Sequence, residues 1–401
     1  MKRLPFITKT ILILSFVSLL TDIASEMLYP IMPLYLSQIG FSIAFIGVLE
    51  GVAEAIAGLS KGFFGYLSDS KRKRKPFVVA GYSLSALAKP MIGVWTNPIW
   101  ILCARSVERL GKGIRTGARD AMLSDETEPA NKGRVFGFHR AFDTLGAALG
   151  PIVALIYLSF HPSQYRPLFF IALIPGIFAI GLSFLLRERP ATQTVDSPRT
   201  SYNPFHYLKY WKVAPKTFRR LVVGLLAFAL FNSSDVFLLL IMKARGLNDQ
   251  FIIVIYIFYN LVYAFASYPL GALGDSIGLK KTLLLGLLIF TGVYGGMAFA
   301  NSTAVFFILF LFYGLYAAAT EGISKAWISN IVAPTDVATA IGFYTSFQSI
   351  CALLASSIAG WLWTVGGPKF VFGLTSIATL CTLFYIAFAV PHEMVTKRVQ
   401  A

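Results

Sequence analysis

Ionisable side chains recur one helical turn apart within apolar stretches of this 401-residue chain. Asp22 and Glu26 lie four residues apart in one stretch, and Arg105 and Arg109 have the same spacing in another. Residues at this spacing share one face of a helix. Charges inside apolar segments are costly and are typical of ion or substrate pathways. The spacing therefore predicts functional charges that face one another between helices.

Four side chains are candidates for binding a coupling proton: Asp22, Glu26, His139 and Asp143. A dry cavity favours the protonated form of a carboxyl group, whereas a facing Arg or Lys favours the ionised form. Motion that separates Asp22 or Glu26 from its cation would promote proton uptake. His139 lies four residues before Asp143, and an imidazole titrates near neutrality, so this pair could shuttle a proton.

Candidate substrate-binding residues lie in both halves of the chain. Arg105, Arg109 and Lys112 follow i, i+4, i+7 and form a cationic helix face. In the second half, Asn232 stands at the position that matches Glu26, and Gln348 at the position that matches Asp143. The first half therefore carries more of the ionisable side chains. The full candidate set is Arg105, Glu108, Arg109, Lys112, Arg115, Asn232, Asp235, Glu321, Lys325, Tyr344 and Gln348.

The buried charges must be compensated. Asp22, Glu26, Arg109 and Lys112 would together cost on the order of 10 kcal/mol if left alone in lipid. This cost is comparable to the stability of a whole domain, so the groups must be paired or hydrated. A fixed salt-bridge network that sets helix register is the alternative to an ion and substrate site. We favour that alternative only for Arg119 and Asp120, which lie near a helix end.

The surrounding segments are long enough to cross a bilayer. Hydrophobic residues make up 56% of the chain and charged residues 13%, a composition unlike that of a soluble domain. Because lipid offers no partners to backbone polar groups, the segments must be helical. Prolines at positions 30, 33, 151, 175 and 269 interrupt several of them. The expected spans are 9–37, 43–68, 76–95, 98–120, 134–158, 167–187, 218–242, 250–273, 280–300, 303–328, 337–365 and 369–390.

The net charge of +16 follows the expected topology. Most Lys and Arg residues fall on one side of the membrane, which marks that side as cytoplasmic and places both termini there. We therefore expect an integral protein of a bacterial inner membrane and no nucleic-acid partner. The three cysteines lie inside apolar spans and predict neither a disulfide framework nor a metal site.

Two stretches of the chain repeat each other 206 residues apart. Gly65 to Asp69 closes one span, and Gly271 to Asp275 closes another. Tandem halves in a membrane chain are typical of transporters, whose site lies between the halves. We expect an all-α membrane protein of twelve transmembrane helices in two pseudo-symmetric six-helix bundles around a central cavity. The expected parts are bundles 1–188 and 218–391, a cytoplasmic linker 189–217 and a cytoplasmic tail 392–401.

The repeated motif resembles the signature of the major facilitator superfamily, Gly-x-Leu-x-Asp followed by basic residues. The resemblance implies that fold, a monomer without cofactors, and loop charges that act as a conformational latch. Simple surface caps are the alternative for the two acids. Gly146 to Pro151 is similar to the glycine–proline motif of the drug–proton antiporter branch. The gating candidates are Gly65, Asp69, Lys73, Arg74, Gly271, Asp275, Lys280, Lys281, Gly146, Gly150 and Pro151.

Together these features predict a proton-coupled secondary transporter that moves a small organic solute by alternating access. The motif from Gly146 to Pro151 favours export. The alternative is import of an anionic compound, such as a ferric polycarboxylate siderophore, attracted by the Arg105, Arg109 and Lys112 face. We do not expect an enzyme, because no set of nucleophile, base and orienting group emerges. The single histidine within the expected spans makes a transition-metal carrier a poor fit.

Overall fold

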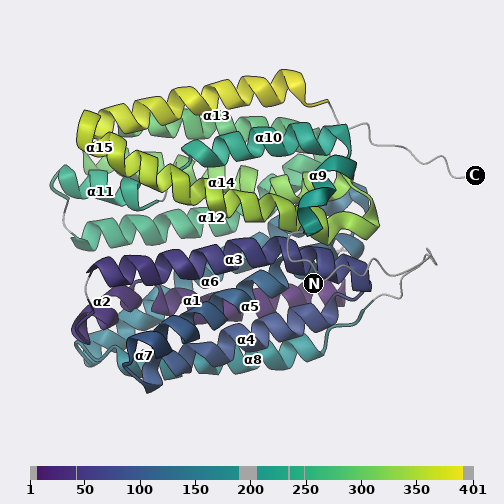
Figure 1. The fold of residues 1–401 in the computed structure, drawn as a ribbon. Helices are drawn as coiled ribbons and strands as arrows, with labels where there is room; N and C mark the ends of the chain where they lie inside the picture. Colours follow the sequence, from purple (N-terminus) through teal and green to yellow (C-terminus); the bar gives the residue numbers. More distant parts are fainter. Residues whose placement is uncertain (1–6, 42, 189–205, 234, 248, 392–401) are drawn as a thin grey trace, which may run out of the picture. The chain divides into compact units, whose positions relative to one another are not determined.

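The computed structural model describes residues 7–41, 43–188, 206–233, 235–247 and 249–391, and every regular element in these ranges is helical (Figure 1). Contacts divide the chain into two compact units. Unit 1 comprises Met1–Glu126, Phe142–Val213 and Pro334–Ile350. Unit 2 comprises Thr127–Ala141, Ala214–Ala333 and Cys351–Ala401. The predicted division into 1–188 and 218–391 remains a prediction.

Unit 1 holds the elements that carry most of the predicted charges. Its complete helices are α1 (Lys9–Leu28), α2 (Ile31–Gln38), α3 (Ile43–Lys71), α4 (Lys75–Val94), α5 (Pro98–Asp125), α7 (Arg166–Ile171), α8 (Leu173–Phe184) and α9 (Tyr210–Val213). A 3-10 helix, His206–Lys209, leads directly into α9. The predicted linker therefore ends in a short helical segment, and its first part, 189–205, lies outside the described residues.

Unit 2 holds the second series of helices. These are α10 (Lys216–Phe231), α11 (Val236–Ala244), α12 (Asp249–Ile277), α13 (Leu279–Met297) and α14 (Thr303–Ile331). Two long helices, α6 (Lys132–Phe160) and α15 (Val337–Ala389), contribute residues to both units. Within α15 the backbone leaves the helical region at Gly367, just before Pro368, so that α15 contains two of the predicted spans.

Prolines explain two of the helix breaks. The first predicted span is divided between α1 and α2 at Tyr29–Pro30, and the sixth between α7 and α8 at Ala172. Pro175 follows the second break by three residues and cannot donate to the carbonyl of Ile171, which favours a break there. The interruptions predicted at Pro151 and Pro269 were wrong, because α6 and α12 continue through these prolines.

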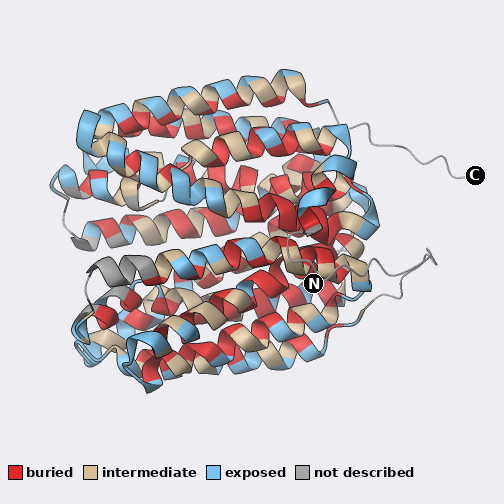
Figure 2. Ribbon diagram, viewed as in Figure 1, coloured by how far each residue is buried: buried red, intermediate tan, exposed pale blue. Residues whose placement is uncertain are grey.

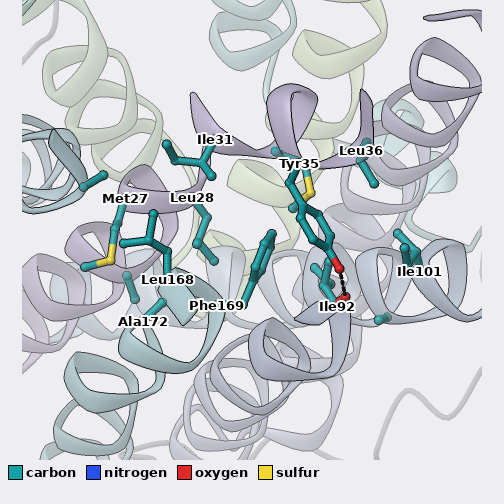
Figure 3. Packing of buried hydrophobic residues seen from close by; sticks show 14 of the residues in the cluster. Met27, Leu28, Ile31, Tyr35, Leu36, Ile92, Ile101, Leu168, Phe169 and Ala172 are labelled. Atoms are coloured by element: carbon teal, nitrogen blue, oxygen red, sulfur yellow. Dashed lines mark hydrogen bonds between the residues drawn. The ribbon is translucent and has the colours of Figure 1, made fainter. Parts of the chain in front are cut away.

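Eight candidate membrane spans emerge from length and apolar composition among the described residues. α5 is not among them because charged residues recur along its length. The core of unit 1 is apolar, and Met27, Ile31, Tyr35 and Phe169 pack together in it (Figure 3). The surface of α8 instead has many exposed residues (Figure 2). Large apolar residues such as Phe178 are among them. An apolar outer face suits contact with lipid.

Candidate functional site

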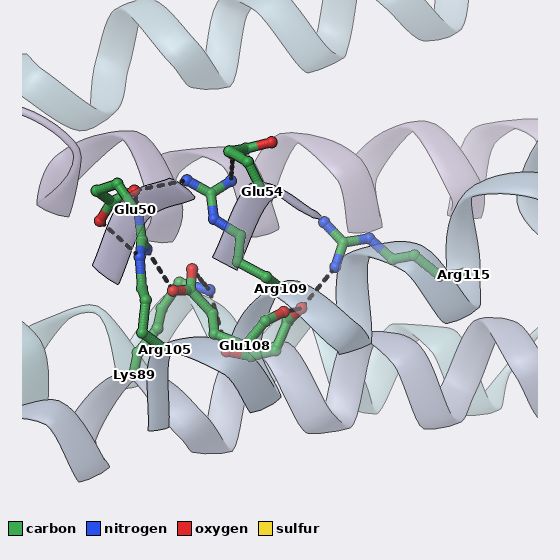
Figure 4. A network of polar contacts seen from close by, with 8 residues as sticks. Glu50, Glu54, Lys89, Arg105, Glu108, Arg109 and Arg115 are labelled. Atoms are coloured by element: carbon green, nitrogen blue, oxygen red, sulfur yellow. Dashed lines mark hydrogen bonds and ion pairs between the residues drawn. The ribbon is translucent and has the colours of Figure 1, made fainter. Parts of the chain in front are cut away.

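Arg105 is the centre of an ionic network between α3, α4 and α5 of unit 1 (Figure 4). Its Nε and Nη2 atoms donate to the two carboxylate oxygens of Glu50, at 3.0 and 2.9 Å. Its remaining terminal nitrogen, Nη1, donates to Oε2 of Glu108, one turn further along α5. All three guanidinium nitrogens therefore have carboxylate partners, which fixes the orientation of the side chain.

Glu108 is shared between two buried cations. Besides accepting from Arg105, its Oε1 atom lies 3.7 Å from Nζ of Lys89 on α4. Lys89 also donates to the backbone carbonyl of Ser85 at 3.1 Å. The side chains of Lys89 and Glu108 are only 1% and 8% exposed. Glu108, predicted as a substrate ligand, thus has both oxygens occupied by protein cations.

Arg109 lies at the more open side of the same network. Its Nη1 atom is 3.0 Å from Oε1 of Glu54, and its Nη2 atom is 3.7 Å from Oε2 of Glu50. The Arg109 side chain is 11% exposed, whereas that of Glu54 is 52% exposed. Its ion pairs are formed with Glu54 and Glu50 of α3, which packs along α5, and Glu26 of α1 is a further charged neighbour.

The exposed side of this network must face water. Counted at 1.5 Å per residue from Lys71, the last residue of α3, Glu54 lies about 25 Å along the helix axis. This depth is within the roughly 30 Å hydrocarbon core of a bilayer. A half-exposed carboxylate facing lipid at this depth would be strongly unfavourable. Lys112 is exposed and lies one turn after Arg109 on α5, so it must face water for the same reason.

A second polar cluster of unit 1 lies between α1 and α6. Asp22 lies within hydrogen-bond reach of Asp143, and Glu26 and Lys112 are its other charged neighbours. Asp143 also accepts from the hydroxyl of Ser18. A hydrogen bond between two carboxyl groups requires that one of them holds a proton. Asp22 and Asp143, both predicted as coupling residues, therefore come together in a geometry that can hold one proton.

Glycines allow the close approach of α1 and α6. A Cβ atom at Gly146 would lie 2.6 Å from the Leu19 carbonyl oxygen, and one at Gly150 would lie 2.6 Å from the Met27 backbone nitrogen. Any larger residue would push the two helices apart. The Gly146–Pro151 motif therefore positions α1 beside α6, a packing role that brings Asp22 close to α6.

Other predicted residues of the first half have structural partners. Arg119 pairs with its neighbour Asp120 at 2.9 Å and lies 3.9 Å from Asp143. Arg115 donates to Ser85 and stacks on the ring of Tyr82, 4.5 Å from its centroid. His139, predicted as a proton shuttle, is buried in unit 2, one helical turn before Asp143 on α6.

The first loop acid, Asp69, caps the start of α15 within unit 1. Its Oδ2 atom accepts from both the backbone N–H and the hydroxyl of Thr339, each at 2.6 Å. Its Oδ1 atom accepts from Arg74, which also lies 3.4 Å from Asp125. Burial opposes the charged form of Arg74, but these two carboxylates outweigh it and leave the pKa of Arg74 raised. A carboxylate at a helix N-terminus is stabilised by the free N–H groups there.

The second loop acid, Asp275, caps the start of α6 in the same way within unit 2. It accepts from the backbone N–H groups of Gly133 and Arg134 at 2.7 and 2.8 Å. The side chains of Asp69 and Asp275 are 5% and 3% exposed, so neither acid is a simple surface cap. The repeat in sequence thus corresponds to a repeated contact.

The predicted basic partners do not all contribute to these caps. Arg134 of α6, rather than Lys280, is the cation beside Asp275, at 3.7 Å. Lys280 donates instead to the carbonyls of Ala387 and Val390 at the end of α15, at 2.7 and 2.6 Å. Lys73 and Lys281 are exposed. Of the predicted basic gating residues, only Arg74 therefore pairs with its loop acid.

The predicted glycines of the repeat lie at helix crossings. A Cβ atom at Gly65 would clash with the Ala338 carbonyl, and one at Gly271 would clash with that of Gly133. Gly65 thus lets α3 approach the start of α15, which Asp69 caps. Gly271 likewise lets α12 approach the start of α6, which Asp275 caps.

The candidate residues of the second half form a more aromatic cluster in unit 2. Asn232 donates to the Tyr316 hydroxyl at 3.0 Å, and the Tyr313 hydroxyl donates to Asp235 at 2.7 Å. Both candidates lie where the chain breaks between α10 and α11. Glu321 lies 3.9 Å from Arg140 on α6. Lys325 is half-buried in unit 2, whereas Tyr344 and Gln348 are assigned to unit 1.

Sequence reasoning missed Glu50, Glu54 and Lys89. The two glutamates are four residues apart within a predicted span, the same spacing that identified Asp22 and Glu26. That signal was present and could have identified them. Lys89 is a single cation in a predicted span, and only its packing against Glu108 shows that it belongs to the network.

Comparisons with known proteins agree with the all-helical fold. The family model described as Major Facilitator Superfamily matches residues 14–258 and 220–400. The uncharacterized MFS-type transporter MJ1317 of Methanocaldococcus jannaschii is 33% identical, covering 95% of each chain. The multidrug resistance protein MdtH of Aeromonas hydrophila is 23% identical over 91% of this chain and 92% of its own length. The structure of the human organic anion transporter MFSD10 (TETRAN) covers 94% of this chain and 98% of its own, with a TM-score of 0.79 and 15% identity.

Proposed function

The chain belongs to the Major Facilitator Superfamily, and we propose that it is a proton-coupled secondary transporter of a small organic solute. Membership in this family makes it an integral membrane transport protein with the all-helical fold of the superfamily rather than an enzyme. The coupling ion, the substrate and the direction of transport are the parts that we propose.

The Asp22–Asp143 pair is the observation that carries proton coupling. The two carboxyl groups lie within hydrogen-bond reach of each other, so they can hold one proton between them, and Lys112 lies nearby. Approach of Lys112 would favour release of this proton, and its withdrawal would favour uptake. A conformational change that alters the distance between Lys112 and the Asp22–Asp143 pair would therefore make the pair bind and release one proton in each transport cycle.

The two buried caps support alternating access. Asp69 joins α3 to α15, and Asp275 joins α12 to α6, so both motif copies bind a helix start that is distant in sequence. We propose that these caps hold one conformational state and break in the other. Breaking a cap leaves helix N–H groups and a buried carboxylate without their hydrogen-bond partners. Half-broken arrangements are therefore unfavourable, and the protein should change between discrete conformational states.

Two directions of transport remain as proposals. Export is supported by two likenesses: Gly146–Pro151 is similar to the glycine–proline motif of drug–proton antiporters, and the chain is similar to a protein named for multidrug resistance. The guanidinium groups of Arg105 and Arg109 support import of an anionic compound. Uptake measured in whole cells and in inverted membrane vesicles separates the two, because a solute that enters only from outside excludes export.

We also propose that the protein is a monomer in a bacterial inner membrane, with both termini on the cytoplasmic side.

The test of coupling uses purified protein in liposomes that contain a pH-sensitive dye. A transported solute should change the internal pH, and Asp22→Asn should lower the number of protons moved per solute while solute flux continues. Asp143→Asn should behave in the same way, because either substitution removes one of the two carboxyl groups. If proton movement persists unchanged in both variants, the pair is not the coupling site.

A further inference from the structure

We propose that Glu54 occupies the place of a substrate carboxylate on Arg109, so that the transporter takes organic anions and exchanges Glu54 for them. The inference rests on the proposed transport function and deepens it by naming the substrate class. It also assigns a role to a residue that was not among the predicted site residues.

The contacts distinguish Arg109 from the other arginine of the network. Arg105 holds Glu50 with two nitrogens and Glu108 with a third, so its donors are used by the protein. Arg109 has one close carboxylate oxygen, from Glu54 at 3.0 Å, and a longer contact of 3.7 Å to Glu50. Because a guanidinium group can bind both oxygens of one carboxylate, Arg109 retains capacity for an incoming anion.

Burial shows which partner can leave. The Glu54 side chain is 52% exposed and that of Arg109 only 11%. Half of the Glu54 side chain already faces water, so Glu54 can turn away with little change in its own hydration. Arg109 cannot be hydrated as easily and keeps only longer-range neighbours, such as Glu50 at 3.7 Å, when Glu54 leaves, which favours a replacement anion. A carboxylate on the substrate provides that replacement.

Exchange of this kind couples the anion to a proton. Arg105, Arg109 and Lys112 of α5 and Lys61 of α3 are the cations that face Glu54. Glu50, one turn earlier on α3, and the substrate itself are the neighbouring anions. Once the substrate has taken Arg109, Glu54 loses its closest cation and lies near a new negative charge. Both changes favour its protonation. One anion and one proton would then move together.

The sign of the pH effect follows from this linkage. Glu54 takes up a proton when the anion binds, so a lower pH must strengthen anion binding. Uptake of about one proton per anion corresponds to a gain in affinity of about tenfold for each unit of pH decrease. The effect should be present only while free Glu54 is ionised.

The experiment uses the full chain in lipid nanodiscs with benzoate, lactate and citrate as anionic probes and benzamide as a neutral match for benzoate. Calorimetry measures binding, and an indicator dye in weak buffer measures proton uptake. We expect at least one carboxylate to bind the wild type with about one proton taken up per anion, and benzamide not to bind. Glu54→Gln should bind the same anion with at least wild-type affinity at neutral pH, without proton uptake and with no dependence on pH.

Glu128→Gln is the matched control, because Glu128 is an exposed carboxylate outside the network and should leave every measurement unchanged. The inference is overturned if none of the three carboxylates binds the wild type, if benzamide binds as well as benzoate, or if Glu54→Gln loses binding or keeps the proton uptake. A carboxylate that binds as expected but never crosses a liposome membrane contradicts the transport function instead.

Discussion

Replacement of Glu108 by glutamine should destabilise the protein strongly. The carboxylate of Glu108 is shared by Lys89 and Arg105, whose side chains are 1% and 6% exposed. Arg105 keeps Glu50 as a partner in the variant, but Lys89 loses its carboxylate. Removing one partner of a buried ion pair costs about 3–5 kcal/mol. Because Lys89 still donates to the Ser85 carbonyl, we expect a loss of about 3 kcal/mol, at the lower end of that range.

The assay is reversible unfolding of the purified protein in mixed micelles, which gives the free energy of unfolding relative to wild type. Lys89→Met in the Glu108→Gln background should recover most of the loss, because an apolar group of similar size can replace a buried charge at little cost. Glu128→Gln should change the free energy of unfolding by no more than about 0.5 kcal/mol. The reasoning is refuted if Glu108→Gln behaves like this control, or if Lys89→Met makes the Glu108→Gln protein less stable.

Three further substitutions test the site and the caps. Arg109→Gln should abolish transport in liposomes while membrane insertion and expression stay normal, and unchanged transport would make the residue structural. Asp69→Ala should weaken the cap on α15 by about 1 kcal/mol, seen as faster amide hydrogen exchange at Thr339, and unchanged exchange at Thr339 would show that Asp69 does not stabilise this helix start. Gly65→Ala should slow transport, because its methyl group would meet the Ala338 carbonyl. Gly51→Ala, with open space around the added atom, should not, and equal rates in the two alanine variants would contradict the role of the crossing.

Much of the helical architecture could be predicted because it depends on local chemistry. Apolar length determined the spans, and the missing N–H of proline accounted for the breaks near Pro30 and Pro175. The same rule failed at Pro151 and Pro269, where the helices continue. The break between α10 and α11 was not predicted, because the 218–242 segment contains no proline.

The choice of partners was harder to predict because it depends on which helices are adjacent. Spacing within one helix identified Asp22, Arg105 and Arg109 as candidates, but it did not reveal that α3 supplies the carboxylates for both arginines. The cation beside Asp275 was likewise expected from its own loop and comes instead from α6. The repeated motif nevertheless located both acids, since each is buried at the start of a distant helix.

Proton movement through the reconstituted protein, followed with a panel of anionic, cationic and neutral solutes, tests the central claim most directly. We expect a transported solute to change the pH inside the liposomes, and the pH change per solute transported to be smaller in the Asp22→Asn protein while the solute still crosses. Solute transport without any pH change in the wild type, or a pH change of full size in the variant, would contradict the claim.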